Sequence, residues 1–140
     1  MRRVWAAYRL ARRLFHCNPP AMFDFLHNDA VLDIDDEGLR HCIHEHQKVF
    51  AKFTAEDCAI CKLLGPSFAK FSKDDDYQGI QFVRLSSEEN PVAKQLMSER
   101  AAPFFVSYCQ GRILECDSLG TDVDVLAQLN RLRAHTPIAK

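Results

Sequence analysis

Two cysteines separated by two residues, Cys58 and Cys61, have the spacing in this sequence that most directly indicates chemistry. They follow residues 48–55, an alternating aromatic and β-branched run that predicts a strand. Apolar residues then recur at helical intervals over residues 58–73. Cys58 is therefore expected where a strand ends and a helix begins, a position at which unpaired N–H groups and the helix dipole favour a thiolate. Cys61 lies one turn further on, within reach of a mixed disulfide at Cys58, so this spacing suits thiol–disulfide exchange.

A zinc site and an incidental pair of structural thiols are the alternatives to a redox pair. Zinc would need two more ligands, and Cys109 and Cys116 flank a predicted turn at Gln110-Gly111 without zinc-knuckle spacing. A two-residue turn there would place Cys109 opposite Arg112 and Cys116 opposite Phe105, so the two cysteines would not face each other. We expect no metal at these positions.

Three histidines and a cysteine between residues 41 and 46 also resemble a metal cluster at first sight. On a helix His41 and His44 share a face, whereas His46 points away, so we expect His41, Cys42, His44 and His46 to be helix residues in solvent contact. The sequence has no glycine-rich phosphate loop, and no cofactor is expected.

The elements that must position the cysteine pair alternate between strand and helix patterns. Predicted strands cover residues 30–34, 48–55, 79–86, 103–109 and 112–119. Predicted helices cover residues 37–47, 58–73, 90–100 and 122–132, the last capped by Thr121. Strand–helix crossovers followed by one hairpin predict an α/β fold, with a central mixed sheet of four to five strands and helices on both faces.

Several separated features resemble the thioredoxin family. The segment FTAEDCAICK (53–62) has the aromatic residue, alanine, acidic residue and C-x-x-C-K unit of that family's active site. Pro66, five residues after Cys61, matches its helix-kinking proline, and Gly111 matches its hairpin glycine. Ala102-Pro103 matches the position of its cis-proline beside the disulfide. The resemblance covers about residues 30–133 and implies a thioredoxin-like fold.

The resemblance also implies an activity and a set of site residues. It implies a protein-disulfide oxidoreductase, acting as a reductase, with Cys58 attacking the substrate disulfide and Cys61 resolving the mixed disulfide. The implied partners are protein disulfide substrates, which dock as an added strand beside Pro103, and a thioredoxin-reductase-type electron donor. The residues implied to contact substrate are Ala59, Ile60, Ala102 and Pro103.

Three positions that depart from the family pattern are expected to modulate the site. Asp57 stands where general reductases of the family have a tryptophan, and an acidic residue beside Cys58 disfavours its thiolate. Lys52 occupies the place of a buried aspartate, and Arg84 the place of its lysine partner. Two buried cations would be costly, so at least one should reach solvent or find an acid such as Glu56.

These departures leave two hypotheses open. A Lys52 ammonium near the Cys61 sulfur would lower the pKa of that thiol and favour the dithiolate, unless the lysine head escapes to the surface. The alternative function is a thioredoxin-fold binding or chaperone-like module that docks partner chains with little or no redox turnover.

Composition and the N-terminal sequence bound the remaining expectations. The chain has 140 residues, of which six are cysteines. Its 18 lysines plus arginines nearly balance its 19 acidic residues, so the charge indicates no nucleic-acid partner. No apolar run is long enough for a membrane helix, so we expect no membrane partner. Residues 1–21 form a basic extension, read as a targeting segment or an exposed helix, and residues 22–140 form the domain. We expect a cytoplasmic protein, or an organellar matrix protein if residues 1–21 are a transit peptide.

Overall fold

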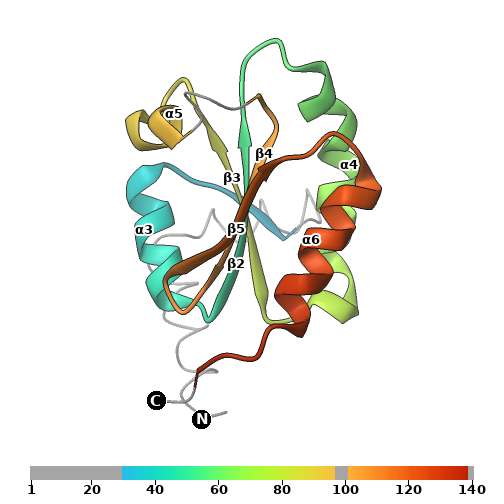
Figure 1. The fold of residues 1–140 in the computed structure, drawn as a ribbon. Coiled ribbons are helices and arrows are strands. Elements are labelled where there is room, and N and C mark those ends of the chain that lie inside the picture. The colour runs from blue at the N-terminus through green and yellow to red at the C-terminus, as the bar shows by residue number, and fades with distance from the viewer. Residues whose placement is uncertain (1–29, 97–100, 139–140) are drawn as a thin grey trace.

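The protein folds around one five-stranded mixed sheet, seen in a computed structural model that describes residues 30–96 and 101–138 (Figure 1). The strands lie in the order β1-β3-β2-β4-β5. β1 and β2 both pair with β3 in parallel, whereas β4 is antiparallel to β2 and to β5. The strands are β1 (Val31–Asp33), β2 (Lys48–Thr54), β3 (Ile80–Ser86), β4 (Phe104–Cys109) and β5 (Arg112–Ser118).

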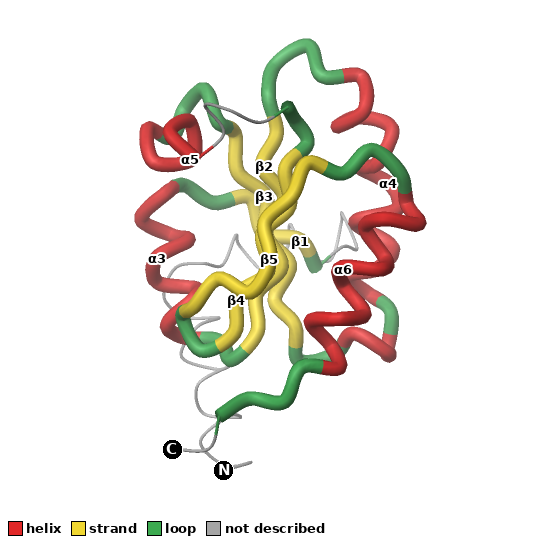
Figure 2. The backbone as a smooth tube through the Cα atoms, in the orientation of Figure 1, coloured by secondary structure: helices red, strands yellow, loops and turns green. Residues whose placement is uncertain are grey.

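Helices cover both faces of the sheet (Figures 1 and 2). One face carries α3 (Asp36–Glu45) and α5 (Pro91–Leu96), and the other carries α4 (Ala59–Lys73) and α6 (Asp122–Ala134). The predicted fold class and element order are therefore confirmed. Residues 97–100 of the predicted third helix, and the extension 1–21, lie outside the described residues. Within the described ranges, no helix has both the length and the apolar character that crossing a bilayer requires.

Two of the helix starts are capped by side chains, and the cap at Thr121 was predicted. The Asp35 carboxylate accepts a hydrogen bond from the Gly38 amide at 2.8 Å, and the Thr121 hydroxyl accepts one from the Asp124 amide at 3.2 Å. Asp36 has a different function, because its carboxylate accepts from the amides of Val92 and Ala93 in the first turn of α5. Asp36 thereby ties α3 to α5 on one face of the sheet.

The core has two layers that follow from the alternation of side chains along β2. Val49, Ala51 and Phe53 point toward the face covered by α3 and α5, and Phe50 points toward α4 and α6. On the α4 side, the rings of Phe50, Phe68, Phe82 and Phe105 pack together with centroid separations of 5.3–5.9 Å. All four of these side chains are buried.

The hairpin between β4 and β5 has the predicted turn but a different register beyond it. Gln110 and Gly111 both have positive φ, 53° and 80°, as a tight two-residue turn requires. Cys109 faces Arg112 as predicted, but Cys116 faces Val106 and not Phe105. The prediction was wrong because a register shift at Ser107/Tyr108 changes the pairing beyond the first two pairs.

The hairpin turn also holds Ile138, the last residue that the structure describes. The Gln110 side chain donates to the Ile138 carbonyl at 2.7 Å and accepts from the Ile138 amide at 2.9 Å. Since β4 runs from Phe104 to Cys109, this clamp lies at the opposite end of the sheet from Pro103.

Candidate active site

Cys58 lies at the strand-to-helix junction that the sequence predicted. It is the N-cap residue of α4, in an extended conformation, and its sulfur accepts a hydrogen bond from the Cys61 amide at 3.1 Å. Cys58 and Cys61 are joined by a disulfide. A thiolate released at Cys58 would therefore face an amide donor and the positive end of a helix that runs to Lys73.

The two sulfurs differ in their access to solvent. Cys58 is half-buried, whereas Cys61 is 7% exposed and belongs to the buried side of α4. An incoming molecule can therefore reach Cys58 before it can reach Cys61.

Pro103 lies at the same end of the sheet as the disulfide. Phe104, the first residue of β4, pairs with Phe53 near the end of β2, the strand that leads to Cys58 (Figure 1). The Ala102–Pro103 peptide bond is cis, as the resemblance implied. Ala102 is half-buried and Pro103 is buried. The structure therefore places the cysteine pair and the Ala102–Pro103 segment at one end of the molecule.

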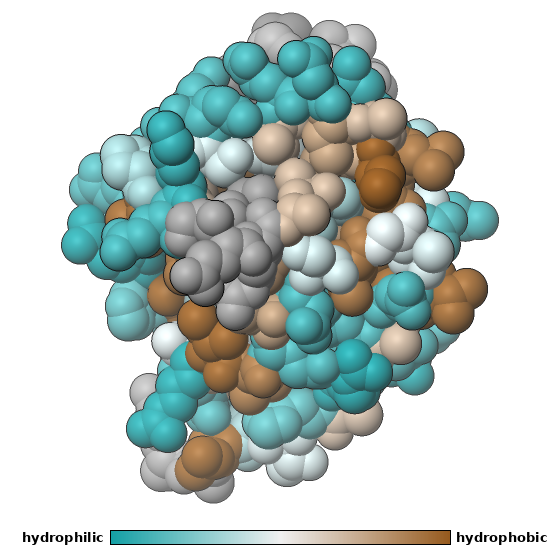
Figure 3. All heavy atoms as spheres, turned by 45° about the horizontal axis from the view of Figure 1, so that its top comes forward, coloured by the Kyte–Doolittle hydropathy of each residue, from teal (hydrophilic) through white to brown (hydrophobic). Residues whose placement is uncertain are grey.

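An apolar surface adjoins the disulfide on the first turns of α4. Ala59 is exposed, the Ile60 side chain is 43% exposed, and Leu63, which the sequence reading did not include, is 72% exposed. Figure 3 shows apolar side chains gathered on the side of α4 and α6 and bordered by polar residues. Leu63 was missed because its position fits the helical apolar repeat, which is typical of residues that face a core.

Lys52 is buried beneath α4. Its position on β2 places it on the same face as Phe50, and it is 1% exposed. Its ammonium donates to the backbone carbonyl of Cys61 at 2.8 Å and lies 5.6 Å from the centre of the Phe68 ring. The alternative in which the Lys52 ammonium reaches the surface is wrong, because the side chain ends beneath α4 with its ammonium bonded to the Cys61 carbonyl.

Arg84 forms an ion pair with Asp33. Its guanidinium makes two hydrogen bonds to the Asp33 carboxylate, at 2.6 and 2.8 Å, across the neighbouring strands β3 and β1. The expected partner Glu56 does not take this place. Lys52 is opposite Arg84 in the register of β2 and β3, so the Asp33 carboxylate offsets part of the positive charge beside Lys52.

The loop before Cys58 is held by a residue that the sequence reading missed. The Glu88 carboxylate accepts from the Glu56 amide at 3.0 Å and from the hydroxyls of Ser86 and Ser87. The Glu56 hydrogen bond is the main cause that holds the pKa of Glu88 below its usual range. Asp57 follows in this loop with a φ of 53° and is exposed. Glu88, which is distant in the sequence, therefore holds the loop that leads to Cys58 in place.

Replacing Glu88 by alanine is expected to lower the hydrogen-exchange protection of the Glu56 amide by about threefold to tenfold, because a charge-assisted hydrogen bond is lost. In the wild type the same protection should fall when the pH drops below the lowered pKa of Glu88, since the carboxylate is then protonated. The neighbouring substitution Glu89→Ala is the control. Equal protection in the wild type and Glu88→Ala proteins would contradict this role.

The histidine cluster is not assembled in the structure. His41 and His44 are exposed, as expected, but Cys42 is fully buried and His46 is 7% exposed after the end of α3. The expectation of solvent contact is wrong for the last two, because they face the core. Within residues 30–96 and 101–138, no group of three His, Cys, Asp or Glu side chains is arranged to hold a metal ion.

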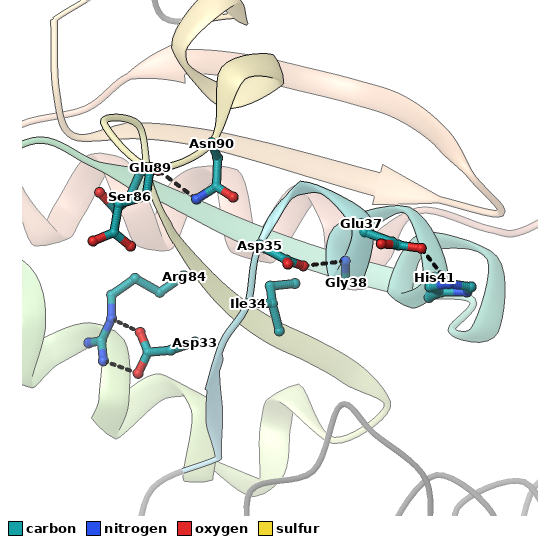
Figure 4. Close-up of a pocket in the computed structure, with 10 residues that line it drawn as sticks. All are labelled: Asp33, Ile34, Asp35, Glu37, Gly38, His41, Arg84, Ser86, Glu89 and Asn90. Carbon is teal, nitrogen blue, oxygen red and sulfur yellow. Dashed lines mark hydrogen bonds and ion pairs between the residues drawn. The ribbon is translucent and has the colours of Figure 1, made fainter.

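A separate hollow of about 800 Å³ lies between the first strand edge and the starts of α3 and α5 (Figure 4). It is lined by Asp33, Ile34, Asp35, Glu37, Gly38, His41, Arg84, Ser86, Glu89 and Asn90. Several of its polar groups bond to one another, as in the Asp33–Arg84 pair and the Asp35–Gly38 cap. Neither cysteine of the disulfide lines it.

The fold and the disulfide at the start of α4 define a thioredoxin-like α/β protein, and comparison with known proteins agrees. The sequence profile of the thioredoxin family matches residues 30–129. Thioredoxin of Ictalurus punctatus is 28% identical over 67 residues, a stretch that covers 48% of this chain and 63% of that protein. The chain thus spans less than two thirds of this curated relative.

Solved thioredoxins share the fold at low sequence identity. The Malassezia sympodialis thioredoxin Mala s 13 superposes with a TM-score of 0.68 at 22% identity, over 76% of this chain and 93% of that one. Thioredoxin f from spinach chloroplast gives 0.68 at 16% identity, over 76% and 96% of the two chains. Oxidised mitochondrial thioredoxin 3 of Saccharomyces cerevisiae gives 0.65 at 21% identity, over 76% and 97%. The chain belongs to the thioredoxin family.

Proposed function

We propose that this protein is a thiol–disulfide oxidoreductase that reduces disulfides of protein substrates through Cys58 and Cys61. The observation that carries the proposal is the disulfide between a half-buried N-cap cysteine and a buried cysteine one turn later. In this mechanism the Cys58 thiolate attacks the substrate disulfide and forms a mixed disulfide, because its sulfur is the accessible one. Cys61 then attacks Cys58 and releases the reduced substrate.

The surroundings of the disulfide support a polypeptide as the substrate. The cis Ala102–Pro103 segment precedes β4 at this end of the sheet, where an extended chain can be aligned by backbone hydrogen bonds. The exposed side chains of Ala59, Ile60 and Leu63 offer apolar contact area next to Cys58. We propose that substrate side chains next to the scissile disulfide pack on this surface.

The proposed electron donor is a thioredoxin-reductase-type protein, and the proposed compartment is the cytoplasm. Cys109 and Cys116 are unbridged thiols, which fits a reducing compartment. Residues 1–21 lie outside the described part of the chain, so a location in an organellar matrix is the other outcome of a localisation experiment.

Reduction of insulin disulfides by the wild-type protein tests the activity. We expect turnover with wild type in the presence of a chemical thiol donor, and Cys58→Ser should reduce turnover to the uncatalysed rate because the nucleophile is lost. Cys61→Ser should accumulate a mixed disulfide that mass spectrometry can identify. The control Cys116→Ser should leave turnover unchanged, since this half-buried thiol lies on the β5 hairpin strand.

The competing function is a binding module without turnover. The observation that favours it is Lys52 in the place of a buried carboxylate. A module of that kind would bind unfolded chains equally well in the wild-type and Cys58→Ser proteins, and neither would reduce insulin. That pair of results would overturn the proposed oxidoreductase activity.

A further inference from the structure

The buried Lys52 ammonium is next to the resolving cysteine. Its nitrogen donates to the carbonyl oxygen of Cys61 itself, at 2.8 Å, and the side chain is 1% exposed. The Phe68 ring covers it from α4. A buried charge is costly unless an opposite charge pairs with it, so we expect a functional state of the protein in which such a charge is present.

Three elements face Lys52, and two of them, β3 and α4, bring an ionisable group. From β3 it faces Arg84, whose own charge is paired with Asp33 of β1. From α4 it faces Cys61, which is bonded to Cys58 in the oxidised state. From β4 its partner in the register is Phe105, which does not ionise.

Among the described residues, no carboxylate forms an ion pair with Lys52. The compensating charge is therefore expected from the sulfur of Cys61, because Lys52 bonds this residue and its sulfur gains negative charge when the disulfide is reduced.

We propose that Lys52 is a positioning residue that serves as the counter-ion of the Cys61 thiolate in the reduced protein. The inference rests on the proposed exchange function and concerns the second half of it. The ammonium favours the thiolate form of Cys61, so it speeds attack on the mixed disulfide. It also stabilises the dithiol state relative to the disulfide, and so makes the protein a weaker reductant than it would be with a neutral residue there.

The resolving step balances as follows. In the mixed disulfide, Cys58 is bonded to a substrate sulfur, and the Cys61 thiolate attacks the Cys58 sulfur. The Cys58–Cys61 bond forms, the bond from Cys58 to the substrate breaks, and the substrate leaves as a thiolate that takes a proton from water. Over the full reaction two electrons pass from the two cysteines to the substrate disulfide, and two protons accompany them.

Lys52 can keep its charge at neutral pH. Burial, and secondly the charge of Arg84, lower the pKa of Lys52 to about 8 in the disulfide state. A thiolate at Cys61 would raise this pKa again, because it favours the charged form. The pair is therefore mutually stabilising in the reduced protein.

The test compares Lys52→Met with the matched control Lys48→Met. Lys48 lies four residues earlier on the same face of β2, and its ammonium bonds to the Arg133 carbonyl, next to Cys109 of β4 and away from Cys58 and Cys61. In a Cys58→Ser background, the ultraviolet absorbance of the Cys61 thiolate is followed against pH as the difference from the same protein carrying Cys61→Ser as well, because the remaining cysteines also absorb as thiolates. We expect the midpoint to rise by about one pH unit or more in Lys52→Met and to stay unchanged in Lys48→Met.

A second measurement uses both cysteines and glutathione as the redox buffer. Lys52→Met is expected to shift the dithiol/disulfide equilibrium toward the disulfide by about tenfold, which corresponds to about 30 mV. If Lys52→Met does not fold, Lys52→Gln is measured in its place.

The outcomes separate this inference from the proposed function. Unchanged Cys61 titration and an unchanged glutathione equilibrium in the Lys52 variant would overturn the counter-ion role while the exchange function stands. A wild-type protein that never equilibrates with glutathione or reduces insulin would refute the exchange function. The Cys61 titration in the Cys58→Ser background would still decide whether Lys52 acts on that sulfur.

Discussion

Replacing Lys52 by methionine is expected to raise the free energy of unfolding of the oxidised protein by about 1–3 kcal/mol at pH 7. In the disulfide state the ammonium is 1% exposed and its pKa is lowered to about 8 by burial. Methionine fills a similar volume without a charge and loses the hydrogen bond to the Cys61 carbonyl, which reduces the gain. Urea unfolding of the two oxidised proteins measures it.

The gain should depend on pH in a direction that identifies its cause. The pKa of Lys52 is lower in the folded protein than in the unfolded chain, so the wild type carries the full cost of the charge below pH 8. Between pH 8 and about 10.5 the folded lysine is neutral while the unfolded one is still charged, and the wild type recovers stability. The advantage of Lys52→Met should therefore shrink over that range. Lys62→Met, an exposed lysine beside Cys61, should change stability by less than about 0.5 kcal/mol.

A stability lower than wild type in Lys52→Met at pH 7 would mean that the ammonium stabilises the disulfide state. That result would remove the reason for expecting a compensating thiolate.

Substituting Phe68 by alanine is expected to lower the free energy of unfolding by about 3–5 kcal/mol. The side chain is 1% exposed and packs against the rings of Phe50, Phe82 and Phe105. The cavity left by its ring would lie under α4, next to the Lys52 ammonium. Denaturant unfolding of the oxidised proteins gives the loss directly.

The matched control for Phe68 lies one turn further along the same helix. Phe71 is half-buried and its ring lies 6.5 Å from that of Tyr77, outside the four-ring cluster. Phe71→Ala should cost clearly less than Phe68→Ala, because less of its ring leaves water on folding. Equal losses for the two variants would contradict the assignment of Phe68 to the centre of the core.

The arrangement of strands and helices could be read from the sequence because each element carries its own period. Side chains along β2 alternate between the two faces of the sheet, and the apolar residues of α4 recur at helical intervals. Gln110 and Gly111 adopt the positive φ that a two-residue hairpin turn requires. The register of β5 could not be read in this way. A turn fixes the first pairs of a hairpin, whereas the shift at Ser107/Tyr108 depends on packing further along it.

The candidate site divides in the same way between local and distant contacts. The position of Cys58 at the start of a helix depends on neighbouring residues in the sequence, so it could be predicted. The fate of Lys52 was not, because a long flexible stem can reach either solvent or the space under α4, and only the packing of Phe68 and Cys61 decides. Glu88 binds a backbone amide 32 residues earlier, and no sequence pattern marks such a contact.

The clamp between the Gln110 side chain and the Ile138 backbone has a practical use. A tether or fluorescent dye attached beyond residue 138 would start from the end of the sheet that lies away from Cys58. The protein could then be immobilised on a bead or a sensor chip with its sulfurs directed outward, so that bait polypeptides meet them without obstruction.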